Sequence, residues 1–471
     1  MSTGVIVTPA RGRTLNPPLI LAALMVVIAS FQLQATMLSP AIADMAARLQ
    51  TNAGVIGWSS TVFLAVSAGL AIFFPPLADK IGRRKVLLLS VALMTLGTLL
   101  VLVTNSVLML MIGRALQGFC GATFALANLT LRSILDPKRY GFYISLVGAI
   151  NSGVAGIDTL LGGMIVDAWS YKGIFLVILI LEAAALAMVL LFVPETTIPA
   201  AARMDWAGAI TVTASLWSLN MALTLGFGTY GWSHPWTLIL LAAGLVLMVV
   251  FLRVEKHAPA PLIPLAELRQ RATLGQLGTT FFALASAFSV LIYLVPTIAL
   301  DPVHGFGMSG TRSALMYLTP FSLLGWALSP LVGKIAPRVG YRLVLRVGLT
   351  GSAAMLACMW AFGMRSPWLL FALALGMGAS WAAMSSTCLN ALGVLYASPH
   401  RPGVLPGLNS AAFNLGAGVG IGVMASIVAG ASTGDAVAGY RAAMLVGLLC
   451  ALLSLGCSML LPGRENEDEK I

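Results

Sequence analysis

The sequence predicts an all-α integral membrane protein. Hydrophobic residues make up 59% of the chain and charged residues only 9%, whereas an ordinary soluble domain has about 25% charged residues. Apolar runs of about 20 residues, the length of a transmembrane helix, recur along nearly the whole chain. The net charge of +11 comes from basic residues scattered singly or in short loops. This pattern indicates membrane topology rather than a nucleic-acid-binding surface.

About fourteen segments are long and apolar enough to span a membrane. We place them at 17–37, 56–76, 86–104, 107–130, 140–165, 173–193, 206–226, 235–253, 273–299, 310–332, 343–363, 367–390, 405–430 and 440–461. With the N-terminus inside, most of the 27 Lys and Arg residues fall on the cytoplasmic side. The exceptions are Arg48, Lys172, Arg312, Arg365 and Arg441 outside, and Arg114 within a span. The positive-inside rule therefore predicts a multi-pass protein of the cell (cytoplasmic or inner) membrane with both termini in the cytoplasm.

The chain contains two related halves. Residues 77–84 (LADKIGRR) and 335–342 (IAPRVGYR) share their apolar, basic and glycine positions, and each segment follows the second span of a six-span half. Chance similarity between short basic loops is the alternative. The predicted organisation is an N-terminal tail (1–16), a six-helix half (17–193), two inserted helices with their flanking loops (194–272), a second six-helix half (273–461) and a C-terminal tail (462–471).

The loop at residues 75–85 (PPLADKIGRRK) resembles the loop between the second and third helices of the major facilitator superfamily. The central segments 204–209, 231–232 and 261–265 resemble the fourteen-helix drug:proton antiporter branch of that family. This resemblance covers nearly the whole chain. It implies two six-helix halves plus two inserted central helices, with the substrate site between the halves near the middle of the membrane.

The family resemblance implies a conformational latch in the first of these loops, formed by Asp79, Lys80, Gly82, Arg83, Arg84 and Lys85. A charge pair there can form in one state of the transporter and break in the other. An inert basic loop is the alternative. The family usually has glycine where Pro75 stands, and Pro75–Pro76 is expected to kink or end the span. The second loop has Pro337 where the first has Asp79, so only the first carries an acidic latch.

Three ionisable residues within spans are candidates for proton coupling. Arg114, with Gln117 nearby, matches the fourth-helix motif of the family. Asp158 stands where the antiporters have a glycine-proline pair, and Glu182 lies at a similar depth on the other arm of the same hairpin. The two acids could interact and titrate as a pair. Ionisable groups within the membrane are functional-site hypotheses by default. A structural ion pair or a buried structural acid is the alternative reading.

The first span lacks the acid that the family commonly has, and carries Gln32 and Gln34 instead. This weakens a direct transfer of the coupling scheme of the family. Other polar or amphipathic residues within spans are candidates for the substrate cavity, although helix–helix hydrogen bonding explains many such residues. The full set of cavity candidates is Gln32, Gln34, Gln117, Asn128, Asn151, Tyr293, Trp381, Ser385, Asn409 and Asn414, to which Ser386 can be added.

These features favour a secondary transporter that exports small amphipathic or hydrophobic compounds (multidrug or metabolite efflux) by proton-coupled alternating access. The alternatives are an importer or facilitator of a small organic solute and a non-transporting, sensor-like relative. No metal-ligand spacing links the cysteines or histidines, and no ATP-binding motif is present. We therefore expect no enzymatic activity and no cofactor, with a proton gradient as the energy source. The expected partners are a small-molecule substrate, protons and the lipid bilayer, without nucleic acid, and the protein is expected to be a monomer.

Overall fold

The computed structural model describes residues 6–8, 16–38, 41–51, 53–135, 137–197, 205–227, 231–258, 261, 265–398, 404–431 and 436–462. Within some helices, including much of residues 137–163, only the backbone is described. The described chain is almost entirely helical, as predicted. A chain that crosses a bilayer must satisfy its backbone hydrogen bonds internally, and the helix does this within one segment.

The N-terminal half contains seven α-helices and a 3-10 turn. They are α1 (Pro17–Thr36), α2 (Ile42–Arg48), α3 (Ala53–Ile81), α4 (Arg83–Val103), α5 (Val107–Gln117), the 3-10 turn η3 (Gly118–Ala122), α6 (Thr123–Ile134) and α7 (Pro137–Phe192). Two helical arms make up α7, which breaks at Ser170, where φ is 65°. This helix packs against α1 of its own half and against α14 of the other half.

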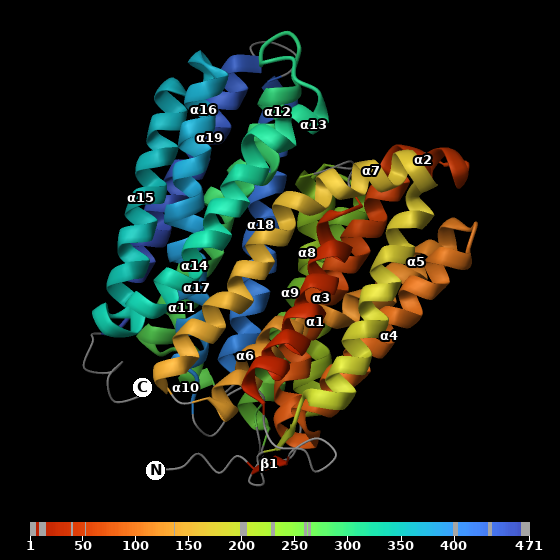
Figure 1. The fold of residues 1–471 in the computed structure, drawn as a ribbon, viewed down its shortest axis with the longest axis vertical. Helices are drawn as coiled ribbons and strands as arrows, with labels where there is room; N and C mark the ends of the chain where they lie inside the picture. The colour runs from red at the N-terminus through yellow and green to blue at the C-terminus, as the bar shows by residue number, and fades with distance from the viewer. Residues whose placement is uncertain are drawn as a thin grey trace.

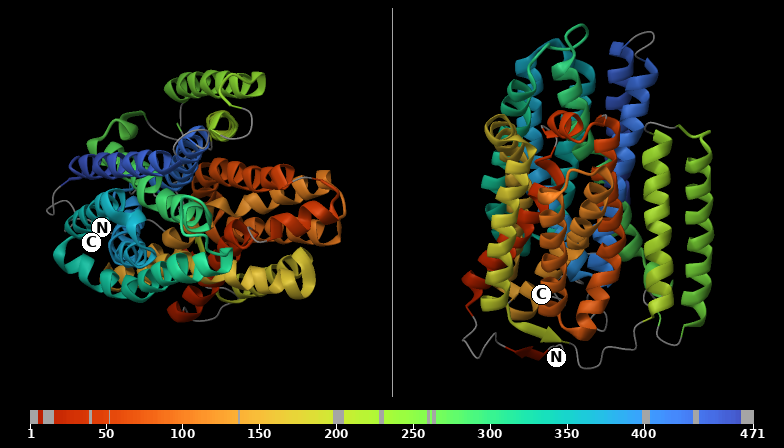
Figure 2. Two further views of the ribbon diagram at one scale, coloured as in Figure 1. Left: turned by 90° about the horizontal axis from the view of Figure 1, so that it is seen from above. Right: turned by 90° about the vertical axis from the view of Figure 1, so that its right-hand side faces the viewer.

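The inserted segment forms the helices α8 (Trp206–Phe227) and α9 (Pro235–His257). Figure 2 shows them side by side, outside the main bundle, and α8 also contacts α3 and α18. At one end of the bundle, β1 (Ile6–Thr8) pairs antiparallel with β2 (Glu195–Thr197). We call this end, at the bottom of Figure 1, the β1 end, and the opposite end the α2 end.

The C-terminal half is built from longer helices that several π-helical segments interrupt. Its elements are α10 (Leu265–Leu268), α11 (Arg271–Ala283), η4 (Leu284–Phe288), η5 (Val290–Leu294), α12 (Val295–Leu300), α13 (Gly310–Ser313), η6 (Ala314–Leu318), α14 (Thr319–Val339), α15 (Tyr341–Phe362), η7 (Gly363–Arg365), α16 (Pro367–Met377), η8 (Gly378–Ser385), α17 (Ser386–Leu395), α18 (Val404–Ala431) and α19 (Ala436–Ser458). Of these, η4, η5, η6 and η8 are π-helical.

Twelve helices in the described part of the chain are long and apolar enough to cross a membrane. The predicted spans at 140–165 and 206–226 are helical but are not among those twelve. The expected total of about fourteen therefore stays a prediction.

The expectation that Pro75–Pro76 could end the second span is wrong, and a kink at these prolines stays a prediction. Helix α3 continues through both prolines to Ile81. Pro75 has no backbone N–H, so it cannot donate a hydrogen bond to the carbonyl of Ala71, four residues earlier. Helix α18 approaches at this point, because a Cβ built on Gly407 would lie 2.7 Å from the Ala71 carbonyl oxygen and 3.4 Å from the Pro75 ring. A proline inside a helix is tolerated here because a neighbouring helix packs against the same stretch, although proline alone is expected to interrupt a helix.

The repeated loops adopt the same backbone conformation in both halves. Gly82 joins α3 to α4 at φ 111° and ψ 132°, and Gly340 joins α14 to α15 at φ 102° and ψ 125°. Positive φ is a conformation that glycine reaches without steric cost. The shared geometry supports the internal repeat inferred from the sequence.

The loop after α12 is held by the carboxylate of Asp301. It accepts hydrogen bonds from the Tyr440 hydroxyl at 2.7 Å and from the backbone N–H groups of Val303 at 2.9 Å and His304 at 3.1 Å. The Tyr440 hydrogen bond is the main cause that lowers the pKa of Asp301 below its ordinary value, and the backbone bonds add to it. These donors favour the ionised carboxylate.

We expect Tyr440→Phe to lower the free energy of unfolding by about 1 kcal/mol at pH 7. Because the pKa of Asp301 is depressed in the folded state, this contribution is present above about pH 4 and is lost as the carboxyl becomes protonated at lower pH. Thermal unfolding at pH 7 and pH 3 measures it. The control is Tyr317→Phe, which removes a hydrogen bond to the uncharged carbonyl of Pro367. An equal pH dependence in both variants would contradict the assignment.

Candidate functional site

A buried polar network lies inside the N-terminal half and joins helices α1, α4, α5 and α7. Gln34 Nε2 donates to Glu182 Oε1 and to Thr98 Oγ1, both at 2.7 Å. Thr98 Oγ1 donates to Glu182 Oε1 at 3.0 Å, and Gln117 Nε2 donates to Thr98 Oγ1 at 3.1 Å. All four side chains are fully buried. The sequence predicted three of these residues and missed Thr98, because one hydroxyl in an apolar span gives no distinctive signal.

Arg114 joins this network on α5. Its Nη1 donates to Gln117 Oε1 at 2.8 Å and to Gln34 Oε1 at 3.2 Å, and its guanidinium lies 4.4 Å from the centre of the Phe63 ring. Arg114 Nη2 and Glu182 Oε2 are buried without a hydrogen-bond partner among the described residues. A buried, incompletely satisfied charge is costly. Gln34 bridges the two groups, since its Oε1 accepts from Arg114 and its Nε2 donates to Glu182.

Asp158 lies on the first arm of α7 and is 1% exposed. Its carboxylate accepts a hydrogen bond from Thr36 of α1. Residues 34 and 36 are about 200° apart around a helix, so Glu182 and Asp158 contact nearly opposite faces of α1. Their titration as a coupled pair stays a prediction, and in this geometry the coupling would pass through α1.

The predicted latch loop contains a buried ion pair. Arg83 Nη2 lies 2.9 Å from Asp79 Oδ1, and the two side chains are 3% and 8% exposed. Arg83 Nη1 also donates to the Leu129 carbonyl of α6 at 2.6 Å. The pair therefore ties the α3–α4 junction to the end of the fourth transmembrane helix. Lys80 and Lys85 are exposed at the β1 end.

Glu195 of β2 completes this junction, and the sequence analysis missed it. Its Oε1 accepts from the backbone N–H of Arg84 at 3.1 Å. A Cβ built on Gly82 would lie 2.4 Å from the same oxygen. The carboxylate thus sits at the N-terminus of α4, where the helix dipole favours negative charge. Glu195 lies more than a hundred residues along the chain from the loop, so local reading could not pair them.

Glu195→Gln is expected to lower the free energy of unfolding by about 1 kcal/mol, because the acceptor remains but its charge at the helix N-terminus is lost. Thermal unfolding in detergent measures the change. Glu267→Gln, on the short helix α10, is the control and is expected to have a smaller effect. Equal unfolding midpoints for wild type and Glu195→Gln would contradict the role.

The other substrate-cavity candidates are divided between the halves. Gln32 donates to Thr36 at 3.3 Å, and Asn128 of α6 has a buried Oδ1 without a hydrogen-bond partner among the described residues. The side chain of Asn151 lies outside the described residues. In the C-terminal half, Ser385 donates to the Ser380 carbonyl at 2.9 Å and Asn414 to the Ser410 carbonyl at 3.1 Å. These last two contacts stay within one helical stretch and explain both residues structurally.

Asn409 belongs to a polar cluster that holds three helices of the C-terminal half together. Its Oδ1 accepts from Thr280 Oγ1 at 2.6 Å and from Gln276 Nε2 at 3.0 Å, and Gln276 also donates to the Leu389 carbonyl at 2.8 Å. Gln276 and Thr280 were absent from the predicted set. Tyr293 is half-buried, and Trp381 lies among aromatic rings.

The two halves meet at the β1 end. Arg132 of α6 donates to the Val394 carbonyl of α17. Lys334 Nζ of α14 lies 5.1 Å from the centre of the Phe142 ring of α7. With the close approach of Gly407 to α3, these contacts join the halves at this end.

Twelve apolar helices in the described part of the chain, a charged network buried among them and contacts that join the two halves at one end are features of a multi-pass membrane transporter of the secondary type. The chain belongs to the Major Facilitator Superfamily, whose family model matches residues 24–421. It is 35% identical over 462 residues to a uridine/deoxyuridine transporter of Lactococcus lactis subsp. cremoris, with 96% of this chain and 95% of that one covered.

Two more distant relatives are resistance or export proteins by name. The chain is 28% identical to the multidrug resistance protein Stp of Mycobacterium tuberculosis, over 84% of this chain and 73% of that one. It is 27% identical to the tetracenomycin C resistance and export protein of Streptomyces glaucescens, over 91% and 79%. The crystal structure of the human organic anion transporter MFSD10 matches the fold with a TM-score of 0.65 at 16% identity, over 94% of this chain and 100% of that one.

Proposed function

We propose that this protein is a proton-coupled transporter of an uncharged nucleoside of the uridine type. The observation that carries the proposal is the distribution of buried charge. In the two six-helix halves, the buried charged side chains among the described residues are Asp79, Arg83, Arg114, Asp158 and Glu182, all N-terminal. The buried polar side chains of the C-terminal half are Ser, Thr, Gln and Asn.

The N-terminal half, with its buried charges, is suited to proton transfer, and the C-terminal half, with its uncharged polar groups, is suited to substrate binding. Ionisable groups inside the membrane suit the binding and release of protons, and Arg114, Glu182 and Asp158 would perform this task. An uncharged half suits an uncharged solute, since a charged one would enter without a counter-charge. The similarity to a uridine/deoxyuridine transporter over nearly the whole chain supports a nucleoside as that solute.

Export of amphipathic compounds is the second candidate. It is favoured by the similarity to Stp and to the tetracenomycin export protein. These matches are weaker in identity and cover less of the relatives, so we rank export below nucleoside transport.

Proteoliposomes distinguish the two functions. Purified protein is reconstituted with a pH-sensitive dye inside, and radiolabelled uridine or ethidium is added outside under an imposed proton gradient. We expect uridine to accumulate inside the liposomes together with a proton flux. We expect ethidium neither to accumulate nor to change the proton flux. Transport of ethidium alone would favour export. Uridine transport without a proton flux would indicate a facilitator. It would exclude a proton-coupling role for Arg114, Glu182 and Asp158.

A further inference from the structure

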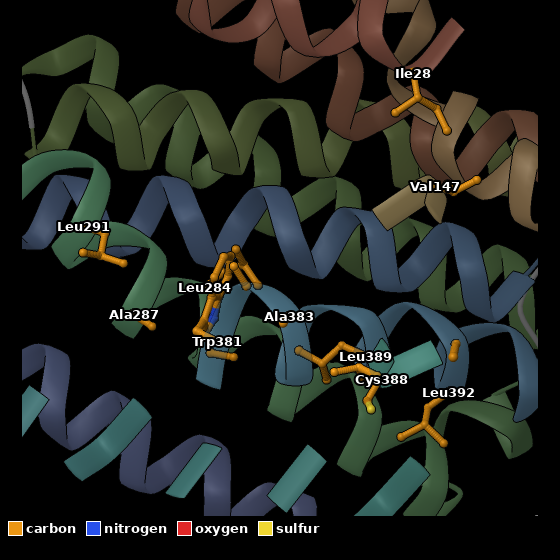
Figure 3. Close-up of a cluster of buried hydrophobic side chains, with 14 of the residues drawn as sticks. Ile28, Val147, Leu284, Ala287, Leu291, Trp381, Ala383, Cys388, Leu389 and Leu392 are labelled. Atoms are coloured by element: carbon orange, nitrogen blue, oxygen red, sulfur yellow. The ribbon is translucent and has the colours of Figure 1, made fainter. Parts of the chain in front are cut away.

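Four aromatic rings form a cluster in the C-terminal half, centred on Trp381. The Phe321 ring stacks on Trp381 with centroids 6.2 Å apart and an interplanar angle of 27°. On another side, Phe288 lies 5.7 Å from Trp381 and 6.1 Å from Phe413. Figure 3 shows Trp381 beside Leu284, with Ile28 and Val147 of the N-terminal half in the same hydrophobic cluster. Trp381 and Phe321 therefore belong to a hydrophobic cluster that continues into the N-terminal half, and Phe288 and Phe413 pack against it.

The indole N–H of Trp381 is unsatisfied. Trp381 is 4% exposed, and its Nε1 has no hydrogen-bond partner among the described residues. A buried tryptophan N–H usually finds an acceptor, and leaving it without one is unfavourable. A ligand oxygen would satisfy it.

The backbone around the cluster is π-helical. Trp381 lies within η8, Phe288 ends η4, and Phe321 follows η6 by three residues. Single π-helical turns are rare and occur frequently at functional sites. Their convergence on one aromatic cluster from three transmembrane helices is independent of the unsatisfied N–H.

One side of the cluster is rigid and the other can adapt. A Cβ on Gly378 would lie 2.5 Å from the Phe321 carbonyl oxygen, and one on Gly325 would lie 2.6 Å from Ala382. These contacts hold α14 and η8 together behind the Trp381–Phe321 stack. Phe288 and Phe413 are only half-buried, so their rings are the ones that can move aside for a planar ligand.

We infer that the Trp381 cluster is a binding subsite for an uncharged heteroaromatic ring, with the indole N–H donating to a ring carbonyl oxygen. The ring stacks against Trp381, Phe288 and Phe413. The inference rests on the proposed function to the extent that it identifies this ring as the base of the transported nucleoside.

Binding of radiolabelled uridine and ribose to the purified protein tests this subsite. Wild type is expected to bind uridine and not ribose, which lacks the ring. Trp381→Phe keeps an aromatic ring but loses the donor, and should weaken uridine binding about fivefold. Trp381→Ala loses the stacking as well and should weaken it at least about thirtyfold. The control is Trp368→Phe, since Trp368 is also paired with a ring, Phe371, but is 71% exposed.

The outcomes separate this inference from the proposed function. Uridine binding that is unchanged in Trp381→Ala would overturn the subsite and leave nucleoside transport standing. If wild type does not bind uridine, the proposed function fails, and uracil and indole become the probes. Binding of either one that is lost in Trp381→Ala would uphold the subsite alone, and binding of neither would overturn it. Thermal unfolding of each unliganded variant verifies that it is folded.

Discussion

Arg114→Ala is expected to reduce proton-driven uridine uptake at least about a hundredfold. The substitution removes the hydrogen bonds to Gln34 and Gln117 and leaves the Glu182 carboxyl buried in a network without a cation. Breaking a buried, charge-bearing network by removing one partner is strongly unfavourable, because the remaining group keeps its desolvation cost. The initial rate of uptake in proteoliposomes, with the internal dye reporting protons, is the measurement.

Two further variants show whether the effect comes from Arg114 itself. Arg114→Lys keeps the charge but not the planar guanidinium, and should retain uptake reduced about tenfold. Arg365→Ala is the matched control, because the Arg365 guanidinium also lies over a ring, 4.8 Å from the centre of Phe362, but at an exposed position. Uptake by Arg114→Ala within twofold of wild type would exclude a coupling role for this residue.

The sequence predicted the helices well because the bilayer leaves the backbone little choice. It also singled out Arg114, Glu182, Gln34 and Gln117, which the structure brings into one buried network, since ionisable and amide groups are conspicuous in apolar spans. The depth of Asp158 could be counted along its helix, but the face of α1 that it contacts depends on how two helices are rotated. Sequence spacing carries no such information between separate helices.

Other residues of the site depend on tertiary contacts that no local pattern contains. Glu195 reaches the Arg84 N–H and lies beside Gly82 only after the second arm of α7 returns to the β1 end. The π-helical segments around Trp381 add one residue per turn, which an apolar run does not reveal. The possible end of the span at Pro75 was wrong for the same reason, because the rule that proline ends a helix ignores the helix packed beside it.

Gly407→Leu is expected to open the β1 end of the bundle and to stop transport. A Cβ at this position already meets the Ala71 carbonyl oxygen at 2.7 Å and the Ile72 Cα at 3.3 Å, and these are backbone atoms that cannot turn away. The added isobutyl group would force α18 from α3 and break the contact of the two halves. Alternating access requires both ends to close in turn. A leucine side chain that keeps the β1 end from closing should therefore hold the protein in the state that is open at this end.

Accessibility of a cysteine at position 394 measures the opening. The five native cysteines are first replaced by alanine, and Val394→Cys is then introduced, since Val394 is 1% exposed and its carbonyl receives the Arg132 contact. In Gly407→Leu, an impermeant maleimide should react with this cysteine at least about tenfold faster, which corresponds to a population shift of about 1.4 kcal/mol. Gly456→Leu is the size-matched control, because a Cβ at Gly456 meets no atom within 4 Å. If both leucine variants label at the wild-type rate, the contact at Gly407 does not hold the β1 end closed.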